Sequence, residues 1–585
     1  LIQNRCINFK LFTNCCNNFF LVIFFTIGAD QCANGFLNHY TINQVVVALH
    51  FYEAGQTRQR GQDQRVLGQF LQVAVPALAC QWPHRRHVAH RHAHRCQQRL
   101  PGHARRAGQA AWLGWLFASA MLAGTFWWLF ISMNVYGGMP AWLAAFAVLL
   151  LAGSLALFYA LAMWAYRTWC TQGVGVMPRA VAFAALWVLA EWGRGTLFTG
   201  FPWGAIGYAH VDSVLHHWAS WVGVYGLCGL AAFVAMFFVA KWQARYTVKR
   251  SWRTHLFSVA CVAGLGFTWV TSSSHVATSE ATARSPITVT LLQGNVPQDL
   301  KFGAGMGHAL SDYRAALLNN TSDLIVLPET ALPVLPEQLP GTYWADLQQH
   351  YVRSQQVALI GLPLRTDRSE GAPPQYTNSA LALQGGARNS AYRYDKHHLV
   401  PFGEFVPPMF QWFVRMMHIP LGDFARGAVA QPSLVWRDER IAPNICYEDL
   451  FGEELAQSFA DPATAPTLLL NLSNIAWFGD TVAIDQHLQI SRMRTLELGR
   501  PMLRATNTGA TAIINARGEV THRLPSGVQA ALTASVRGVD GPVTPYARWV
   551  SAWGLWPLVL LCLGAFAVVA WLSSQLRHGQ RRFGP

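Results

Sequence analysis

The sequence has too little charge for an ordinary soluble protein of its length. Only 12% of the 585 residues are charged, whereas 52% are hydrophobic and 24 are tryptophan. About one-quarter of the residues of a soluble domain are charged. The shortage argues against a wholly soluble protein, and the apolar excess indicates a chain that is embedded in a lipid bilayer.

Acidic residues are scarcer than basic ones, which gives a formal net charge of +15. Such a surplus can indicate nucleic-acid binding. Nine of these positive charges come from residues 1–106, which hold 12 Lys and Arg against three Asp and Glu, and no RNA- or DNA-binding motif accompanies them. The rest of the surplus clusters beside apolar stretches, as the positive-inside rule describes. We therefore expect no nucleic-acid partner.

Six apolar stretches approach the roughly 20 residues that a helix needs to cross a bilayer core. Their approximate ranges are 112–133, 141–163, 179–198, 218–240, 255–272 and 550–572. Lys and Arg crowd the connection at 241–253 and the tail at 574–585, so both are predicted to be cytoplasmic. The polar block between the last two spans then lies on the other side of the membrane.

The chain is therefore predicted to combine a multi-span α-helical membrane domain with an α/β domain outside the cytoplasm. From residue 287 onward, short β-rich runs alternate with helical runs, which is typical of stacked α/β layers. The predicted parts are an atypical segment at 1–106, the membrane domain at 107–273, the α/β domain at 287–538, a C-terminal span at 550–573 and a cytoplasmic tail at 574–585.

Residues 1–106 do not fit this plan. Residues 84–103 read HRRHVAHRHAHRCQQRLPGH, without the period of a strand or a helix. Their six histidines, with Cys80 and Cys96, match no metal-ligand spacing, so we expect no metal there. A disordered basic tail is one interpretation. We favour another interpretation, a non-native or misframed segment in place of two membrane helices. Leu1 is not a start methionine, and sequence that resembles a known protein family, described below, begins abruptly near Ala111.

Cysteine is almost absent from the predicted α/β domain. Cys446 is the only cysteine between Ile287 and Arg537, so it has no partner for a disulfide within that domain. The other cysteines of the apolar region lie in or beside the predicted spans, where a small apolar side chain packs well. Cys446 is therefore the one candidate thiol nucleophile of the α/β domain.

Three reactive residues stand at the ends of predicted strands: Glu329, Lys396 and Cys446. Strand ends are where α/β sheets gather catalytic groups. A thiol attacks only as its thiolate, so a nearby glutamate suits the general base, and an ammonium suits the oxyanion that forms at the attacked carbonyl. Each residue alone has a more ordinary interpretation, as a buried small hydrophobe, a solvated cap or a solvent-facing lysine. The combination favours acyl-transfer chemistry.

The strings around these residues resemble the three signature segments of the nitrilase superfamily, in the same order. They read LPET at Glu329, YDKHHLVPFGEFVP at Lys396 and NICYEDLF at Cys446. The strings QGNVPQDLKF and EWGRGTLFTGFPWGAIGY further resemble the membrane-embedded branch, the bacterial apolipoprotein N-acyltransferase family. The resemblance covers about residues 107–575. It implies a nitrilase-type αββα sandwich that needs no metal and no cofactor.

The resemblance also implies the reaction and its place. Cys446 takes a fatty acyl chain from a phospholipid as a thioester and passes it to the N-terminal amine of the diacylglyceryl-cysteine of an apolipoprotein. The expected partners are a phospholipid donor, a diacylated apolipoprotein acceptor and the bilayer. The expected location is the bacterial inner (plasma) membrane, with many spans and the catalytic domain on the periplasmic side.

Six further residues are expected to support the site or bind substrate by the same resemblance. They are Glu404, Tyr447, Glu448, Phe302, Trp203 and Arg194. Ordinary alternatives remain for several of them: Glu448 could pair with Lys396 or an arginine, and Tyr447 could be core. Arg194 lies three residues after Glu191 and could pair with it merely to close the helix end.

The sequence departs from the family pattern at three places. Phe302 stands where the family usually has tryptophan, Ile475 stands at a usually acidic position, and the first two membrane helices are not recognisable. A membrane-tethered amidase for small C–N substrates is the main rival, and a transporter or a non-catalytic scaffold is another. The predicted spans argue against a soluble-type amidase, and the few ionisable residues within them argue against a transporter.

Overall fold

The structure is a computed structural model that describes residues 101–170, 174–244, 284–301, 303, 305–366, 374–385, 392–406 and 424–582. The predictions for residues 1–100, the predicted span at 255–272 and the residue Phe302 lie outside the described residues. All described residues belong to one compact unit of the chain.

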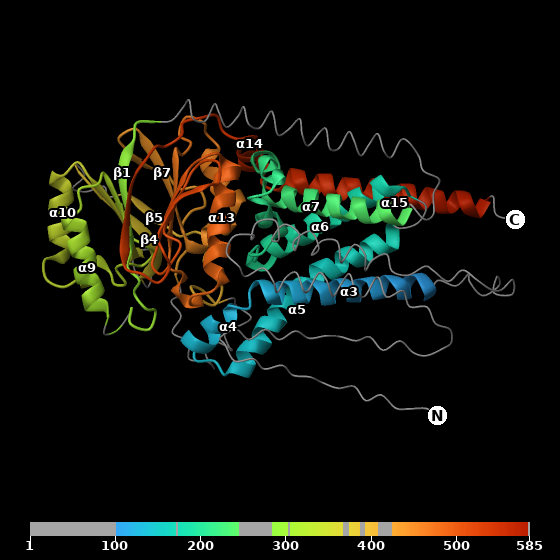
Figure 1. Ribbon diagram of the computed structural model, residues 1–585, viewed down its shortest axis with the longest axis horizontal. Helices are drawn as coiled ribbons and strands as arrows, with labels where there is room; N and C mark the ends of the chain where they lie inside the picture. The colour runs from blue at the N-terminus through green and yellow to red at the C-terminus, as the bar shows by residue number, and fades with distance from the viewer. Residues whose placement is uncertain are drawn as a thin grey trace. The chain divides into compact units, whose positions relative to one another are not determined.

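Apolar helices form the first part of the described chain (Figure 1). They are α3 (Pro101–Thr125), α4 (Leu129–Ile131) with the π-helical turn η2 (Ser132–Tyr136), α5 (Ala141–Trp169), α6 (Val176–Thr196) and α7 (Ala219–Ala244), and α15 (Trp556–Arg582) follows near the C-terminus. Among the residues that the structure describes, four helical stretches are long and apolar enough to span a membrane: Ala141–Trp169, Val176–Thr199, Val214–Trp242 and Trp556–His578. These stretches cover four of the six predicted spans.

Two predicted spans differ in detail from the helices of the structure. The span expected at 112–133 is a pair of helices, Arg106–Thr125 and Leu129–Tyr136, bent by 65°. The span expected from residue 550 begins instead at Trp556, because a separate helix, α14 (Pro545–Trp553), precedes it. Gly554 separates the two helices with a φ of 60°, a backbone conformation that glycine adopts without strain.

In chain order, the described residues between α7 and α14 form two six-stranded mixed sheets. The first has the order β12-β1-β2-β3-β4-β5, with β12 (Ala530–Val536), β1 (Ile287–Gln293), β2 (Leu324–Val326), β3 (Val357–Thr366), β4 (Gln375–Gln384) and β5 (Arg393–Asp395). The second has the order β11-β10-β9-β8-β7-β6, with β11 (Val520–Arg523), β10 (Ala512–Ile514), β9 (Met502–Thr506), β8 (Leu468–Ser473), β7 (Glu439–Ile445) and β6 (Leu434–Trp436). The central strands β1 to β3 and β7 to β9 are parallel.

The two sheets pack face to face and are covered on their outer faces by helices. Side chains such as Leu324 and Leu359 of the first sheet share one apolar cluster with Ile445 and Leu470 of the second. Helices α9 (Met306–Asn319) and α10 (Tyr343–Arg353) cover the outer face of the first sheet, and α13 (Val482–Leu498) covers that of the second (Figure 1). The predicted αββα sandwich beside apolar helices is confirmed.

The apolar cluster under α13 continues into the membrane helices. It contains residues of the second sheet and α13, such as Met493 and Met502, together with residues of α6 and α7, such as Trp187 and Leu227. A strand that is buried on both faces has a nearly continuous apolar sequence. Strand β8, with the sequence LLLNLS, is such a strand, since all six of its residues are buried. The second sheet and its covering helix therefore share one apolar core with the membrane helices.

Candidate active site

Glu329, Lys396 and Cys446 each stand just after a strand. Glu329 follows β2, Lys396 follows β5 directly, and Cys446 follows β7 directly. The backbone N–H of Lys396 donates to Asn378 O on β4 at 2.8 Å, which continues the strand pairing up to the reactive residue. The sheet ladders thus fix the point from which each side chain starts.

The side chains of Lys396, Glu329 and Glu404 form one buried ionic cluster. Lys396 Nζ lies 3.1 Å from Glu329 Oε1 and 2.9 Å from Glu404 Oε1. Asn378 Nδ2 donates to the same two carboxylate oxygens, at 2.8 and 2.7 Å. The second oxygen of Glu329 accepts from Asn474 N at 2.8 Å. Each carboxylate is therefore held by several donors, as a buried charge requires.

The cluster keeps Glu329 ionised. Burial raises the pKa of Glu329, but the charge of Lys396, the hydrogen bond from Asn378 and the charge of Lys301 outweigh it, and the net pKa lies below the usual 4.5. Burial lowers the pKa of Lys396, but the charges of Glu329 and Glu404 outweigh it and raise the pKa well above its usual value. Near neutral pH the site thus contains a carboxylate and an ammonium.

Cys446 occupies a strained elbow between β7 and the turn η8 (Cys446–Leu450). Its φ is 54°, which is uncommon for a non-glycine residue and persists only where the surroundings hold it. Burial and the charge of Glu329 raise the pKa of the thiol to about 12, against the opposing charge of Lys396. Resting Cys446 is therefore a thiol that needs a base before it can attack.

Glu448 links the nucleophile elbow to the lysine loop. Its carboxylate accepts from Ile445 N at 2.6 Å, His397 N at 2.6 Å and Tyr394 Oη at 2.9 Å. Burial raises its pKa to about 7, although these hydrogen bonds oppose the shift. The alternative interpretation, a pairing of Glu448 with Lys396 or an arginine, does not describe these contacts, since its partners here are backbone N–H groups and a phenol.

Arg194 and Trp203 organise the loop that follows helix α6. Arg194 pairs with Glu191 at 2.7 Å, and both side chains are fully buried. Arg194 Nη1 also donates to Phe201 O at 2.6 Å and Trp203 O at 3.0 Å. The pairing with Glu191 is therefore present, but the arginine also fixes the loop beyond the helix end.

This loop touches the residue next to the nucleophile. Tyr447 is buried, and its hydroxyl donates to Gly200 O at 3.1 Å. His398, two residues after Lys396, lies with Nε2 3.0 Å from Thr199 O. Tyr447 is thus a contact between the catalytic domain and the membrane domain as well as a core residue.

Comparisons with known proteins agree with this arrangement. Residues 99–237 match the family model of the apolipoprotein N-acyltransferase N-terminal domain, and residues 288–538 match that of carbon-nitrogen hydrolase. The apolipoprotein N-acyltransferase of Verminephrobacter eiseniae is 52% identical over 460 residues, which cover 76% of this chain and 84% of the relative. That of Ralstonia nicotianae is 45% identical over 466 residues, or 79% and 86% of the two chains.

The chain belongs to the apolipoprotein N-acyltransferase family. The predicted family, its acyltransferase class and the membrane character of the chain are thereby confirmed, and the rival small-substrate amidase is not favoured. The specific roles of Glu329, Lys396 and Cys446 stay predictions, which the geometry of this family member makes testable.

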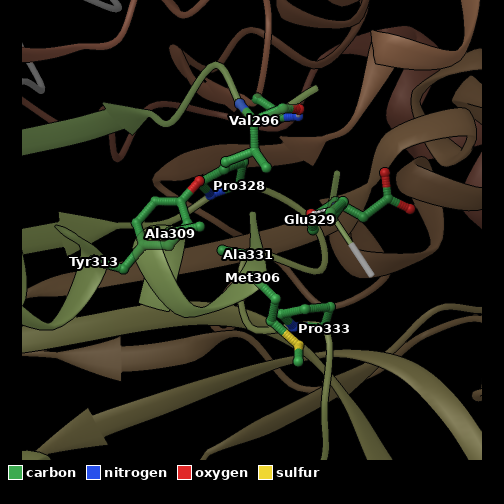
Figure 2. A pocket seen from close by; sticks show the side chains of 10 residues that line it. Val296, Met306, Ala309, Tyr313, Pro328, Glu329, Ala331 and Pro333 are labelled. Carbon is green, nitrogen blue, oxygen red and sulfur yellow. Dashed lines mark hydrogen bonds between the residues drawn. The ribbon is translucent and has the colours of Figure 1, made fainter. Parts of the chain in front are cut away.

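Lys301 is a site residue that the sequence-based prediction missed. Its Nζ donates to Thr330 Oγ1 at 2.5 Å and to Glu329 O at 3.3 Å, so it clamps the backbone that carries Glu329. Burial lowers its pKa to about 8. Figure 2 shows the pocket beside this segment, with Glu329 among the side chains that line it. The sequence did hold a sign of this role, since Lys301 lies in the string QGNVPQDLKF, which resembles the family pattern.

The remaining predicted features are placed as follows. Phe302 lies outside the described residues, so its proposed support of the site stays a prediction. Ile475 is buried in the turn after β8 and contributes to the apolar cluster shared with the membrane helices. Within the part of the chain that the structure describes, no three His, Cys, Asp or Glu residues are grouped to hold a metal ion.

Proposed function

We propose that this protein transfers a fatty acyl chain from a phospholipid, through a thioester on Cys446, to the N-terminal amine of the diacylglyceryl-cysteine of apolipoproteins. The observation that carries the proposal is the contact between the reactive centre and the membrane domain, where Tyr447 Oη donates to Gly200 O. A nucleophile that serves lipid-anchored substrates must lie at the membrane, whereas one that serves small soluble amides has no such need.

In the first step, Glu329 removes the proton of Cys446 while the sulfur attacks the ester carbonyl of the phospholipid. The C–S bond forms, and negative charge develops on the former carbonyl oxygen. We assign Lys396 to stabilise this oxyanion with its ammonium group, a kind of stabilisation that is usually the largest single contribution to catalysis. Collapse breaks the ester C–O bond, Glu329 returns its proton to the glycerol oxygen, and a lysophospholipid leaves.

In the second step, the uncharged α-amine of the lipoprotein attacks the thioester carbonyl. Glu329 accepts a proton from the amine as the C–N bond forms, and the C–S bond breaks. The proton then returns from Glu329 to the thiolate, which restores the starting enzyme. Attack by water would waste the acyl group, so the burial of Glu329 and Lys396, with 6% and 1% of their surfaces exposed, favours transfer over hydrolysis.

The supporting residues act by position. Glu404 shares Lys396 with Glu329 and so balances its charge, and Glu448 holds the elbow of Cys446 against the lysine loop. We propose that Phe302 supplies an aromatic side chain for contact with an acyl chain or a loop, and we assign Trp203 with Arg194 to the loop that joins the membrane helices to the site. No metal or cofactor takes part in these steps.

The proposed location is the inner membrane of a bacterium, with the catalytic domain on the periplasmic side. Lys241 lies in the last turn of α7, before the predicted span at 255–272, and Arg577 stands near the far end of α15, so one span separates each of these positive charges from the catalytic domain. The positive-inside rule places these charges in the cytoplasm. The acceptor lipoprotein and the donor phospholipid are then both reached from the periplasmic face.

Product analysis tests the proposal. Detergent-solubilised protein mixed with a phospholipid and a diacylated lipopeptide should release lysophospholipid and form the N-acylated peptide, and Cys446→Ala should abolish both products while the protein still inserts into membranes. Release of ammonia from small amides, with no lysophospholipid, would instead support the amidase.

A further inference from the structure

A fully buried polar cluster lies directly behind Cys446, and the reaction steps above do not use it. Its members are Asp449, Asn471, His487, Ser491 and Arg504, each at most 1% exposed. Asp449 is its centre. One carboxylate oxygen lies 2.8 Å from His487 Nε2, and the other accepts from Ser491 Oγ at 2.5 Å and from Arg504 Nη1 at 3.3 Å.

The contacts of His487 fix its tautomer. Arg504 Nη2 lies 2.6 Å from His487 Nδ1, and a guanidinium can only donate, so Nδ1 is the unprotonated nitrogen and Nε2 carries the hydrogen. Burial and the charge of Arg504 lower the pKa of His487, against the opposing charge of Asp449, which keeps the ring neutral. The Nε2–H group therefore has a fixed direction.

That direction is toward the nucleophile. His487 Nε2 lies 3.2 Å from Cys446 O as well as 2.8 Å from Asp449 Oδ1, so its one hydrogen is shared between the two acceptors. Asn471 Nδ2 is a second, longer donor to Cys446 O at 3.4 Å. These side chains hold the carbonyl of a residue whose φ of 54° needs external support.

The opposite side of His487 faces the membrane domain. The Trp203 ring stacks on the His487 ring, with centroids 5.4 Å apart and an interplanar angle of 28°. The neighbouring Gln486 Oε1 accepts from Trp203 Nε1 at 2.7 Å and from Trp128 Nε1 at 3.0 Å. Gln486 Nε2 donates to Thr125 O at 2.9 Å, at the break between α3 and α4.

We propose that His487 is a positioning residue that fixes the elbow of Cys446 and couples it to the docking of the Trp203 loop. This inference rests on the proposed function of Cys446 as the acyl-carrying nucleophile. When the loop after α6 is docked, Trp203 holds the imidazole plane, and the imidazole holds the Cys446 carbonyl. The thiol then points to the acyl donor only while the membrane domain is engaged.

Two amide variants separate this role from simple packing. In His487→Gln the amide nitrogen reaches the place of Nε2 and can still donate to Cys446 O. In His487→Asn the shorter amide reaches only the place of Nδ1, so it can accept from Arg504 but cannot donate to Cys446. Both variants keep a neutral polar group in the cluster. If His487 served only for packing, both variants would therefore form acyl-Cys446 at the same rate.

The readout is the single-turnover rate of acyl-Cys446 formation by the full chain in detergent, with palmitoyl-oleoyl phosphatidylethanolamine as the donor and intact-protein mass spectrometry as the detector. Because small misplacements of a reacting group can lower rates by about 100-fold, His487→Asn should lose about that factor in the maximal single-turnover rate constant, with little change in the phospholipid concentration that gives half of the maximal rate. His487→Gln should recover at least about a tenth of the wild-type rate. His350→Leu on α10, in the layer beyond the first sheet, is the matched control and should keep the rate.

The possible outcomes are distinct. Equal rates for folded His487→Asn and folded His487→Gln, at any level, overturn the positioning role, and parallel melting curves establish that both variants are folded. If His487→Asn does not fold, His487→Gln alone tests the positioning role. A folded His487→Gln variant can still donate to Cys446 O, so loss of acyl-Cys446 formation in that variant contradicts the inference. A wild-type chain that forms no acyl-Cys446 overturns the proposed function itself, which is a different result from a normal rate in His487→Asn.

Discussion

Lys396 Nζ lies 3.1 Å from Glu329 Oε1 in a site where both side chains are nearly inaccessible to water. The same ammonium lies 2.9 Å from Glu404 Oε1, so one cation serves two buried carboxylates. This arrangement leaves the general base ionised, since the lysine opposes the effect of burial on Glu329. It also means that the lysine cannot be removed without leaving two like charges in a buried site.

Lys396→Met should therefore lose stability as well as activity. Breaking a buried ion pair by removing one partner costs about 3–5 kcal/mol, because the remaining charge is uncompensated. We expect a lower melting temperature and no acyl-Cys446. The double variant Lys396→Met/Glu404→Gln should regain part of the stability but none of the activity. Thioester formation at the normal rate in either variant contradicts the oxyanion role.

Glu329→Gln should separate the acidity of the thiol from catalysis. The charge of Glu329 helps to raise the pKa of Cys446 to about 12, so its removal lowers that pKa and increases the thiolate fraction at pH 9. Iodoacetamide should then label the Cys446 peptide faster than in the wild type. Acyl transfer should nevertheless fall by about 100-fold to 10,000-fold, because the general base is lost. Slower labelling, or retained acyl transfer, would show that the electrostatic account is wrong.

Glu448→Gln tests the link between the nucleophile elbow and the lysine loop. The carboxylate accepts from Ile445 N and His397 N on different oxygens, whereas a glutamine presents one oxygen and an NH₂ group that faces a backbone donor. An unsatisfied buried donor costs about 1–3 kcal/mol. We expect a lower melting temperature and slower thioester formation, measured on the same preparation. A variant that matches the wild type in both would remove Glu448 from the account.

The orientation of the chain is tested by two tags. A tag after Arg582 should be cytoplasmic, and a tag inserted at 369–374 should be periplasmic. The reason is that one predicted span separates the catalytic domain from the Lys and Arg residues at 241–253, and another separates it from those at 574–585. Protease accessibility in intact and permeabilised spheroplasts distinguishes the two sides. Both tags on one side would contradict the predicted number of spans.

The sequence predicted the features that depend on local composition. The apolar length of residues 141–163 was sufficient to predict a span, and the apolar run before Cys446 was sufficient to predict a buried strand, because hydrophobic patterns repeat along the chain. The same pattern did not reveal the bend of 65° between α3 and α4. There, Trp128 and Gln486 bond across 358 residues, a contact that no local pattern encodes.

Within the site, the sequence singled out the candidate reactive residues more readily than the groups that hold them. Cys446 stood out as the only thiol of its domain. His487 and Lys301 did not, because the role of each depends on a contact that only folding creates. His487 contacts the carbonyl of Cys446, which is 41 residues away in sequence, and Lys301 contacts that of Glu329, which is 28 residues away. A lysine is usually exposed and a histidine occurs both in the core and at the surface, so neither side-chain type alone indicates a buried supporting role.

Mass spectrometry of the intact protein after mixing with a defined phospholipid, without any acceptor, tests the central claim most directly. The account predicts a mass increase of one fatty acyl group on Cys446, labile to hydroxylamine as a thioester is, together with one equivalent of lysophospholipid. The adduct should disappear when a diacylated lipopeptide is added. An unmodified Cys446 in a preparation that still acylates the lipopeptide would contradict the account.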